Sequence, residues 1–432
     1  MRRGWTKNLP LIPASARSFL RPLRALASLA GSITALVQRE SRSLAQGFAA
    51  NLASSLGDLF AGAVLGSITG RLEALPGLLI LIPPAIGMRG NIFAAMGSRL
   101  GTALHLGAFE PALRRGAVLG DNVSAATVNT LVLSVAMAPM ARIACVAFGV
   151  TAISTVDFMV ISVVGGVLAS AVLLVITVFI AIVSARKGWD LDYVSPPLVT
   201  FIGDVVTLPS LVVASYLARI PYVTPLVATA VLFSACAVVA WELSHGNARA
   251  RRIVKESIPV LVLAAIVDIV AGVTLDKRVE TFLVFPAFLV MLPAFLEDSG
   301  SLGSMLAARL SSRLHAGIIS PSPYPLEALP EFALLFILSI PVYLILGVSS
   351  SVVSAVIGAE SPGVLAMLGI TLGAGLLATI FAAVVAYYGA IASYRIGLDP
   401  DNHGTPLVTS SMDVAASVAL IVVLALAGYA RL

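Results

Sequence analysis

The sequence has little charge, few cysteines and few histidines. Only 11% of its 432 residues are charged, and it contains two cysteines and four histidines. Soluble domains carry about 25% charged residues, so the composition excludes an ordinary soluble protein. Both cysteines lie in apolar runs, which argues against a disulfide framework. So few Cys and His residues, scattered along the chain, also exclude a metal site of the zinc type.

Apolar residues dominate the chain, at 59% of the total with a mean hydropathy of +1.00. Runs of about 20 apolar residues are long enough to cross a bilayer as helices. We therefore expect an all-α polytopic membrane protein with about eleven spans. They are predicted near residues 47–67, 76–97, 117–138, 155–184, 197–218, 224–243, 257–275, 281–297, 331–350, 363–393 and 406–430.

The net charge is +5, which could indicate a nucleic-acid partner, but the basic residues have a simpler explanation. With the N-terminus in the cytoplasm, only six of the 27 Lys and Arg fall on the outer side. These six are Arg71, Arg142, Arg219, Lys277, Arg278 and Arg431. Such a bias sets membrane topology. We expect a multi-pass plasma-membrane protein with a cytoplasmic N-terminus and no nucleic-acid partner. Residues 1–45 fit a basic amphipathic segment on the inner leaflet, or a tail.

The chain contains an internal repeat. SPPLVTFIGD (195–204) matches GTPLVTSSMD (404–413) at an offset of 209, and SRLGTALHLG (98–107) matches ARLSSRLHAG (308–317) at 210. Ordered matches of this kind indicate duplication. Each half has five predicted spans and one span lies between them, so both halves enter the membrane in the same direction. We predict a cytosolic segment (1–45), a first five-helix repeat (46–220), a linker helix (221–247) and a second repeat (248–432).

The repeated motif places a carboxylate inside each fifth span. Thr200 lies four residues before Asp204, and Thr409 four residues before Asp413, so hydroxyl and carboxylate share one helix face. Parallel two-fold symmetry can bring the two faces together. Two facing carboxylates need a cation between them, or one must be protonated. The alternative is that each Asp caps or hydrogen-bonds a neighbouring helix.

Further acidic residues occur in pairs. Asp58 and Asp268 lie mid-span in the first helix of each half, where they form either a second ion or proton site or interhelical hydrogen bonds. Four more precede the fifth spans and are predicted to form an acidic vestibule, with a solvated loop as the alternative. These four are Asp190, Asp192, Asp399 and Asp401.

The second span is interrupted by polar and helix-breaking residues. IPPAIGMRGN (82–91) ends at Asn91, and its counterpart MLPAFLEDSGS (291–301) contains Glu297 and Asp298. Irregular backbone at membrane depth is tolerated where it lines a cavity. We therefore expect broken backbone here, with Asn91, Glu297 and Asp298 available to an ion. A Pro-kinked packing helix is the alternative.

These motifs resemble the membrane domain of MgtE-type magnesium transporters, and more closely their duplicated solute-carrier relatives. The resemblance rests on PPAIGMRGN…SRLGTA in the second span and D…PLVT…D at the fifth. MgtE proteins are homodimers whose five-helix domains form a central pore. The resemblance implies such a dimer fused into one chain, which allows a monomer. It assigns the pore Asp to Asp204 and Asp413, and the preceding acidic residue to Asp190 and Asp399.

Two departures from the family pattern qualify what the resemblance implies. No cytosolic magnesium-sensing region is present, so gating by such a domain is not expected. Glu297-Asp298-Ser299 replaces the Gly-rich Asn motif in the second half, which argues against strict two-fold ion coordination.

The leading functional hypothesis is a divalent-cation channel or transporter with Mg²⁺ as cargo, Mn²⁺ or Co²⁺ as alternatives, and no organic cofactor. Mg²⁺ keeps several waters and is held by one or two carboxylates. A second hypothesis is Na⁺- or H⁺-coupled exchange, with Asp58, Asp268 and Glu297-Asp298 carrying the coupling ion. A third is an intramembrane aspartyl protease, since FIGD resembles a Gly-x-Gly-Asp motif. Phe201 replaces its first Gly and the second half reads SSMD, so an enzyme is not expected.

Overall fold

The computed structural model describes residues 51–187, 191–315, 317–395 and 400–430, and four positions before residue 51. Contacts divide the chain into two compact units, Met1–Gly47 and Phe48–Leu432, and every long helix described belongs to the second. The amphipathic segment predicted for residues 1–45 lies outside the described residues, apart from Gln38 and Ala45.

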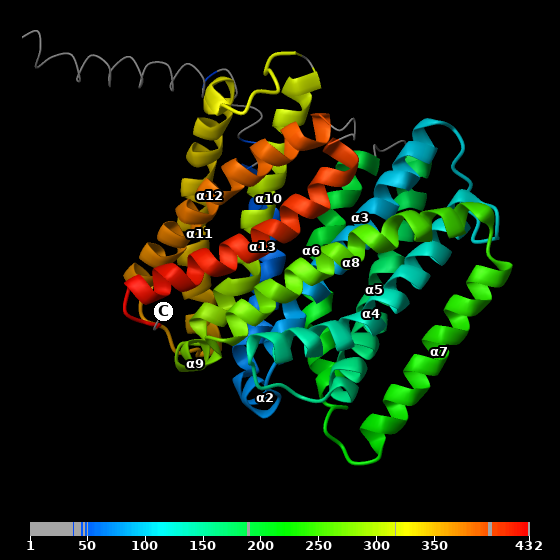
Figure 1. The fold of residues 1–432 in the computed structure, drawn as a ribbon, viewed down its shortest axis with the longest axis horizontal. Coiled ribbons are helices and arrows are strands. Elements are labelled where there is room, and N and C mark those ends of the chain that lie inside the picture. The colour runs from blue at the N-terminus through cyan, green and yellow to red at the C-terminus, as the bar shows by residue number, and fades with distance from the viewer. Residues whose placement is uncertain are drawn as a thin grey trace, which may run out of the picture. The chain divides into compact units, whose positions relative to one another are not determined.

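The described residues form helices and no strands (Figure 1). A helix over residues 51–67 comes first. The elements that follow are α2 (Thr69–Ala74), η1 (Leu78–Leu81), α3 (Ile82–His105), α4 (Val118–Phe148), α5 (Thr155–Lys187), α6 (Leu191–Ser215), α7 (Val223–His245), α8 (Ala248–Asp276), α9 (Val279–Val284), α10 (Ala287–His315), η2 (Pro325–Ala328), α11 (Leu329–Ile357), α12 (Val364–Arg395) and α13 (Pro400–Leu426). The prediction of an all-α membrane protein is confirmed.

Each of the eleven predicted spans overlaps a long helix, although the span predicted at 281–297 is divided between α9 and α10. Not all of these helices are long and apolar enough to cross a membrane. In the described part of the chain, eight stretches are long and apolar enough. The three that are not among them are the 51–67 helix, α6 and α10. In α6 the apolar part is short, Ile202–Ser215, and α10 contains Glu297 and Asp298. The number eleven therefore stays a prediction.

Equivalent helices in the two halves end with the same type of C-terminal cap. Gly149 (φ 67°) caps the C-terminal end of α4 and Gly358 (φ 71°) caps that of α11, at positions 209 residues apart. A left-handed glycine lets the chain satisfy the last carbonyl groups of a helix without steric strain. In α4 the Gly149 N–H reaches back toward the carbonyl groups of Cys145 and Val146. The duplication visible in the sequence thus extends to local backbone geometry.

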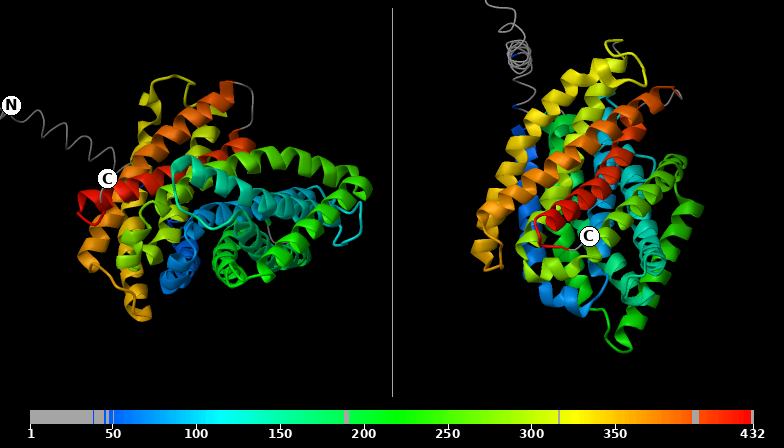
Figure 2. Two further views of the ribbon diagram at one scale, coloured as in Figure 1. Left: turned by 60° about the horizontal axis from the view of Figure 1, so that its bottom comes forward. Right: turned by 60° about the vertical axis from the view of Figure 1, so that its left-hand side comes forward.

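The packing order is also the same in both halves. α3 lies against α4, α5 and α6, and α10 lies in the same way against α11, α12 and α13. Consecutive helices pair as well, α5 with α6 and α12 with α13. The α12–α13 pair, orange and red, stays side by side in every view (Figures 1 and 2). The division into repeats at 46–220 and 248–432 is itself untested and stays a prediction.

The first helix of each half packs on the other half. α8, which opens the second half, lies against α3 and α4 of the first half as well as against α13 (Figure 1). The 51–67 helix contacts α10 in return: Asn51 Nδ2 and Ser55 Oγ donate hydrogen bonds to Asp298 Oδ1, at 2.7 and 2.6 Å. Nothing in the repeat pattern predicted this exchange.

Glycines mark where these exchanged helices cross their partners. A Cβ on Gly62 would overlap the backbone carbonyl of Val290 in α10, and a Cβ on Gly272 would overlap that of Ile80 in η1. Both pairs are related by the offset of 210. Only glycine allows the backbones to approach this closely. The exchange therefore depends on the same residue type in both halves.

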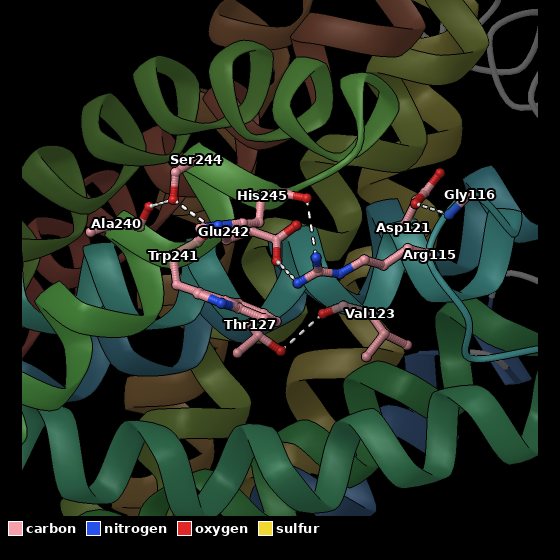
Figure 3. Close-up of polar contacts among 10 residues, drawn as sticks. All are labelled: Arg115, Gly116, Asp121, Val123, Thr127, Ala240, Trp241, Glu242, Ser244 and His245. Carbon is pink, nitrogen blue, oxygen red and sulfur yellow. Dashed lines mark hydrogen bonds and ion pairs between the residues drawn. The ribbon is translucent and has the colours of Figure 1, made fainter.

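The linker helix α7 lies at the edge of the bundle, where it packs on α4 and α5 (Figure 1). Arg115, in the segment before α4, contacts the C-terminal end of α7 (Figure 3). The guanidinium lies 4.0 Å from the centroid of the Trp241 ring and 3.9 Å from the Glu242 carboxylate. It also donates to the His245 carbonyl oxygen at 3.2 Å. These contacts attach α7 to the first half.

Candidate functional site

The polar segments 82–91 and 291–301 of the second spans lie within continuous helices, so the expectation of broken backbone there was wrong. Residues 82–105 form one helix, as do residues 287–315. Pro83 and Pro84 fall in the first turn of α3, where a missing N–H breaks no intrahelical hydrogen bond. Pro293 lies in the second turn of α10. Pro293 removes one intrahelical hydrogen bond, the one to the Leu289 carbonyl, without ending α10. The sequence therefore overstated the interruption in both segments.

These two helices nevertheless line a cavity of about 390 Å³. Its wall also includes residues of α6, α13 and the 51–67 helix. Six of the predicted site residues line it, three from each half of the chain: Asp58, Asn91, Asp204, Glu297, Thr409 and Asp413. The fold thus gathers residues that are as much as 355 positions apart in sequence.

The acidic residues at the cavity form two groups. The Asp58 and Asp204 carboxyl groups lie within hydrogen-bonding reach of each other, and those of Asp268 and Asp413 lie in the same relation. Each group joins a first-helix Asp to a fifth-helix Asp of the same half. Asp268 stands behind the wall, since it contacts Asp413 without lining the cavity.

The carboxylates are buried and have few hydrogen-bond partners. Asp58 and Asp268 are each 1% exposed. Among the described residues, the Asp58 carboxyl has only the Asp204 carboxyl within hydrogen-bonding reach, and the Asp268 carboxyl has only the Asp413 carboxyl and the Ser410 hydroxyl. One carboxylate oxygen of Asp204 has no hydrogen-bond partner in the described structure. No Lys or Arg is among the described residues that line the cavity. Buried negative charge with few donors and no basic partner requires a cation or a proton.

The two halves contribute unequally at one equivalent pair of positions. Gly87 of α3 and Glu297 of α10 are 210 residues apart, and both line the cavity. An ideal Cβ on Gly87 would lie 2.8 Å from Asp268 Oδ2, so a larger residue there would crowd that carboxylate. On the opposite side, Glu297 adds a further carboxylate beside Asp58. The asymmetry expected from the second-span motif is therefore present in the cavity.

Several predicted site residues lie elsewhere. Asp298 does not line the cavity, because its Oδ1 accepts hydrogen bonds from the 51–67 helix. This geometry opposes its assignment as a direct ion ligand. Thr200, Asp192 and Asp401 lie in described helices, but their side chains are not described. Asp190 and Asp399 lie outside the described residues, so the predicted vestibule stays a prediction.

The cavity also contains hydroxyl groups that the sequence analysis did not select, namely those of Ser54, Ser301, Ser304 and Ser410. Ser54 lies four residues before Asp58, the same spacing that selected Thr200 and Thr409, so this signal was available. Ser301 is the counterpart of Asn91 at the offset of 210. In the part of the chain that the structure describes, no three His, Cys, Asp or Glu side chains come together in an arrangement that could hold a metal ion.

Comparison with known proteins gives two kinds of match. The family model of MgtE, described as a divalent cation transporter, matches residues 82–214 and 292–423. These two ranges begin 210 residues apart and end 209 apart, the offsets of the internal repeat. No solved structure matches the chain.

Curated relatives belong to solute carrier family 41. Member 3 from Rattus norvegicus is 26% identical over 276 residues, which cover 61% of this chain and 58% of the rat protein. Member 3 from Mus musculus is 24% identical over 363 residues, covering 78% of this chain and 72% of the mouse protein. Member 2 from Gallus gallus is 26% identical over 263 residues, covering 58% of this chain and 44% of the chicken protein. A large part of each relative therefore lies outside the match.

Proposed function

Since the chain belongs to the MgtE family of divalent cation transporters, we propose that it carries Mg²⁺ across the membrane through the cavity between α3, α6, α10 and α13. Membership makes it a transporter and not an enzyme, which removes the aspartyl protease hypothesis. The Asp pair in α6 and α13 is the centre of the proposed path.

One observation carries the proposal. Asp58, Asp204, Glu297 and Asp413 line a single cavity to which the described residues contribute no basic side chain. An arrangement of this kind repels anions and stabilises a cation. Asn91 and Thr409 supply neutral oxygen atoms in the same wall. Carboxylate, amide and hydroxyl oxygens are hard ligands of the type that Mg²⁺ binds.

The size of the cavity favours an ion that keeps its water. Water occupies roughly 30 Å³ in the liquid, so a volume of about 390 Å³ accommodates Mg²⁺ with its inner hydration shell. Mg²⁺ gives up that shell reluctantly and is usually bound through one or two carboxylates plus waters. Direct ligation by several protein groups is not required on this view. Mn²⁺ and Co²⁺ are the alternative cargoes, and comparing the fluxes of the three ions in the same liposome assay distinguishes them.

The proposal includes the architecture inferred from the repeat. Residues 46–220 and 248–432 form two parallel repeats about a pseudo-two-fold axis that passes between Asp204 and Asp413, and residues 221–247 connect them. One chain then contains a whole pore, so a monomer is sufficient. The protein spans the plasma membrane with its N-terminus in the cytoplasm.

A second candidate is coupled exchange, in which Na⁺ or H⁺ drives Mg²⁺. It is favoured by the burial of Asp58 and Asp268, which have no basic partner among the described residues that line the cavity and lie next to the fifth-helix carboxylates. Mg²⁺ flux into liposomes should then change when a Na⁺ or pH gradient is imposed. An Mg²⁺ flux that changes with neither the Na⁺ nor the pH gradient would identify a passive channel.

The test of the main proposal is the double variant Asp204→Ala/Asp413→Ala of the full chain. Both carboxylates are removed from the path, so Mg²⁺ uptake into liposomes with an entrapped Mg²⁺ indicator should fall to background. Glu256→Ala is a matched control, because Glu256 is an exposed acid paired with Arg252 and lies away from the cavity. Size-exclusion profiles show whether the double variant is folded. Normal uptake by a folded double variant would remove the cavity from the transport path.

A further inference from the structure

Exposed basic residues gather at the junction between α7 and α8. Arg115 lies in the segment before α4, and Arg249, Arg251 and Lys255 lie within the first eight residues of α8; all four are exposed. We call these four residues the basic patch. They differ from Arg89 of α3, which is 1% exposed and whose Nε and Nη2 have no hydrogen-bond partner in the described structure. The positive-inside bias explains the side of the membrane on which the patch lies, but it does not require the charges to gather at one junction.

Buried acids position two members of the basic patch. The Asp121 carboxylate accepts a hydrogen bond from the Gly116 N–H at 2.9 Å and lies 3.6 Å from Arg249 Nη1. The Arg115 guanidinium lies 3.9 Å from the Glu242 carboxylate (Figure 3). Since Arg115 directly precedes Gly116, these contacts bring Arg115 and Arg249 close together. Their side chains remain 47% and 51% exposed, so part of each guanidinium faces outward.

The start of α8 carries charge of the sign that a helix start disfavours. The N-terminal end of a helix has a partial positive charge, which favours acidic side chains there. The first turn of α8 contains no acidic residue, and Arg249 and Arg251 add positive charge to it. Asp121 balances part of this charge from below. Arg114 and Arg252 are not counted in the patch, because each is paired at 2.7 Å with an acid four residues away. The junction is therefore stabilised further by an anion.

The basic patch lies at the level of the lipid head groups. Its α8 members precede residue 257, the predicted start of the apolar span, by two to eight residues, which is about 3–12 Å along the helix. The head-group region of a bilayer is roughly 5–8 Å thick on each side. Trp241 of α7, whose ring centroid is 4.0 Å from the Arg115 guanidinium, is 54% exposed. Tryptophan is enriched at this depth, so two separate features place the junction at the membrane surface.

An apolar stripe continues from the basic patch along α8. Pro259, Leu263 and Ile266 follow Lys255 at intervals of four, four and three residues, and this spacing keeps them on one helix face. All three are exposed, Leu263 and Ile266 at 47% each. Basic side chains followed by an exposed apolar stripe match the order of head group and acyl chain in a phospholipid.

We propose that an anionic phospholipid binds at the α7–α8 junction, with its phosphate against the basic patch and an acyl chain along Leu263 and Ile266. Basic segments next to a membrane-spanning helix attract anionic lipids, whereas phosphatidylcholine would place a second positive charge beside the patch. No patch residue lines the cavity, so this site is separate from the proposed Mg²⁺ path. Because α8 also carries Asp268 and packs against α13, the bound lipid stabilises a helix that joins the two halves.

The internal repeat supplies a matched control for the test. Arg251→Gln/Lys255→Gln removes two exposed charges from the patch. Arg186→Gln/Arg395→Gln removes two exposed charges from equivalent positions near the ends of α5 and α12, 209 residues apart. Native mass spectrometry of the full chain, titrated with phosphatidylglycerol, gives the Kd of the lipid. We expect the patch variant to raise this Kd about tenfold or more and the control variant about twofold or less.

Three results would overturn the proposal. Equal changes of Kd in the two double variants would show that the basic residues act only through their total charge. Equal affinity of the wild-type chain for phosphatidylcholine with the same acyl chains would show that the patch does not select an anionic lipid. Competition by glycerophosphoglycerol at the same concentration would show a site for soluble phosphate esters.

Thermal unfolding provides a second measurement of the same binding. Phosphatidylglycerol should raise the unfolding temperature of the wild-type chain and of the control variant by more than that of the patch variant, because a ligand stabilises the folded state that binds it. Equal increases in all three proteins would contradict a site at the junction. Neither measurement involves Mg²⁺, so failure of the proposed transport function would leave both results unchanged.

Discussion

At the scale of single residues, the least expected feature is Arg89. An unpaired charge inside a membrane protein is costly, and such residues usually contact an ion path or a counter-charge. Arg89 belongs to the helix that lines the cavity with Gly87 and Gly90, but its guanidinium points away from the cavity, toward α5. It can therefore weaken cation binding without touching the cation. Such a residue suits a transporter, because cargo that is bound too tightly is released slowly.

Arg89→Gln should accordingly raise the affinity for Mg²⁺, by about threefold or more, since it removes repulsion that acts through a medium of low dielectric constant. Titration calorimetry on the full chain in nanodiscs measures the change. Arg252→Gln is the control, as Arg252 is exposed and paired with Glu256. Unchanged or weaker binding in Arg89→Gln would mean that the guanidinium serves packing only.

At the scale of helices, the exchange of first helices between the halves depends on close backbone contacts. Gly62 meets Val290 and Gly272 meets Ile80, and each contact is with backbone atoms that cannot rotate away. In a bilayer, helices associate through such close packing, since lipid supplies no hydrophobic driving force between them. Asn51 and Ser55 add hydrogen bonds to Asp298 at one crossing. The crossing fixes where Asp58 lies relative to Glu297.

Gly62→Ala should destabilise the protein by about 1–3 kcal/mol, because the added methyl group forces the helices apart. Gly369→Ala is the matched control: Gly369 is an exposed glycine within α12, and a Cβ there meets nothing within 4 Å. That change should be neutral or stabilise by up to about 1 kcal/mol, since alanine favours helix. Thermal unfolding in detergent compares the two. Equal unfolding temperatures would show that the 51–67 helix is not held at this crossing.

At the scale of the whole molecule, the exchange makes each half incomplete. The 51–67 helix contributes to the packing of α10, and α8 contributes to the packing of α3 and α4. The cavity likewise draws its wall from both halves. A single half therefore exposes helix surfaces that are made to meet protein, among them the polar side chains around Asp298. The two halves behave as parts of one folding unit.

Cutting the chain in the loop between α6 and α7 tests this interdependence. Residues 1–220 and 221–432 produced separately should aggregate or be degraded, because each lacks the first helix of the other. Produced together, they should co-purify through a tag on one half and restore Mg²⁺ uptake in liposomes. Either half transporting Mg²⁺ alone would show that the exchange of helices is not needed for function.

The sequence by itself determined the fold class, the positions of the helices and the family, because hydropathy and repeated motifs are local properties that any reader of the chain can measure. It also selected Asp204, Asp413, Asp58 and Glu297, since a carboxylate in an apolar run is conspicuous. Only the tertiary structure decided how these residues group. Helix periodicity says which side chains share a face, but not which helix that face meets. The turning of Asp298 toward Asn51 follows from a helix that crosses between the halves. The pairing of Asp58 with Asp204 and the burial of Arg89 beside Gly166 follow from contacts between helices of the first half. All three depend on packing between residues far apart in the chain.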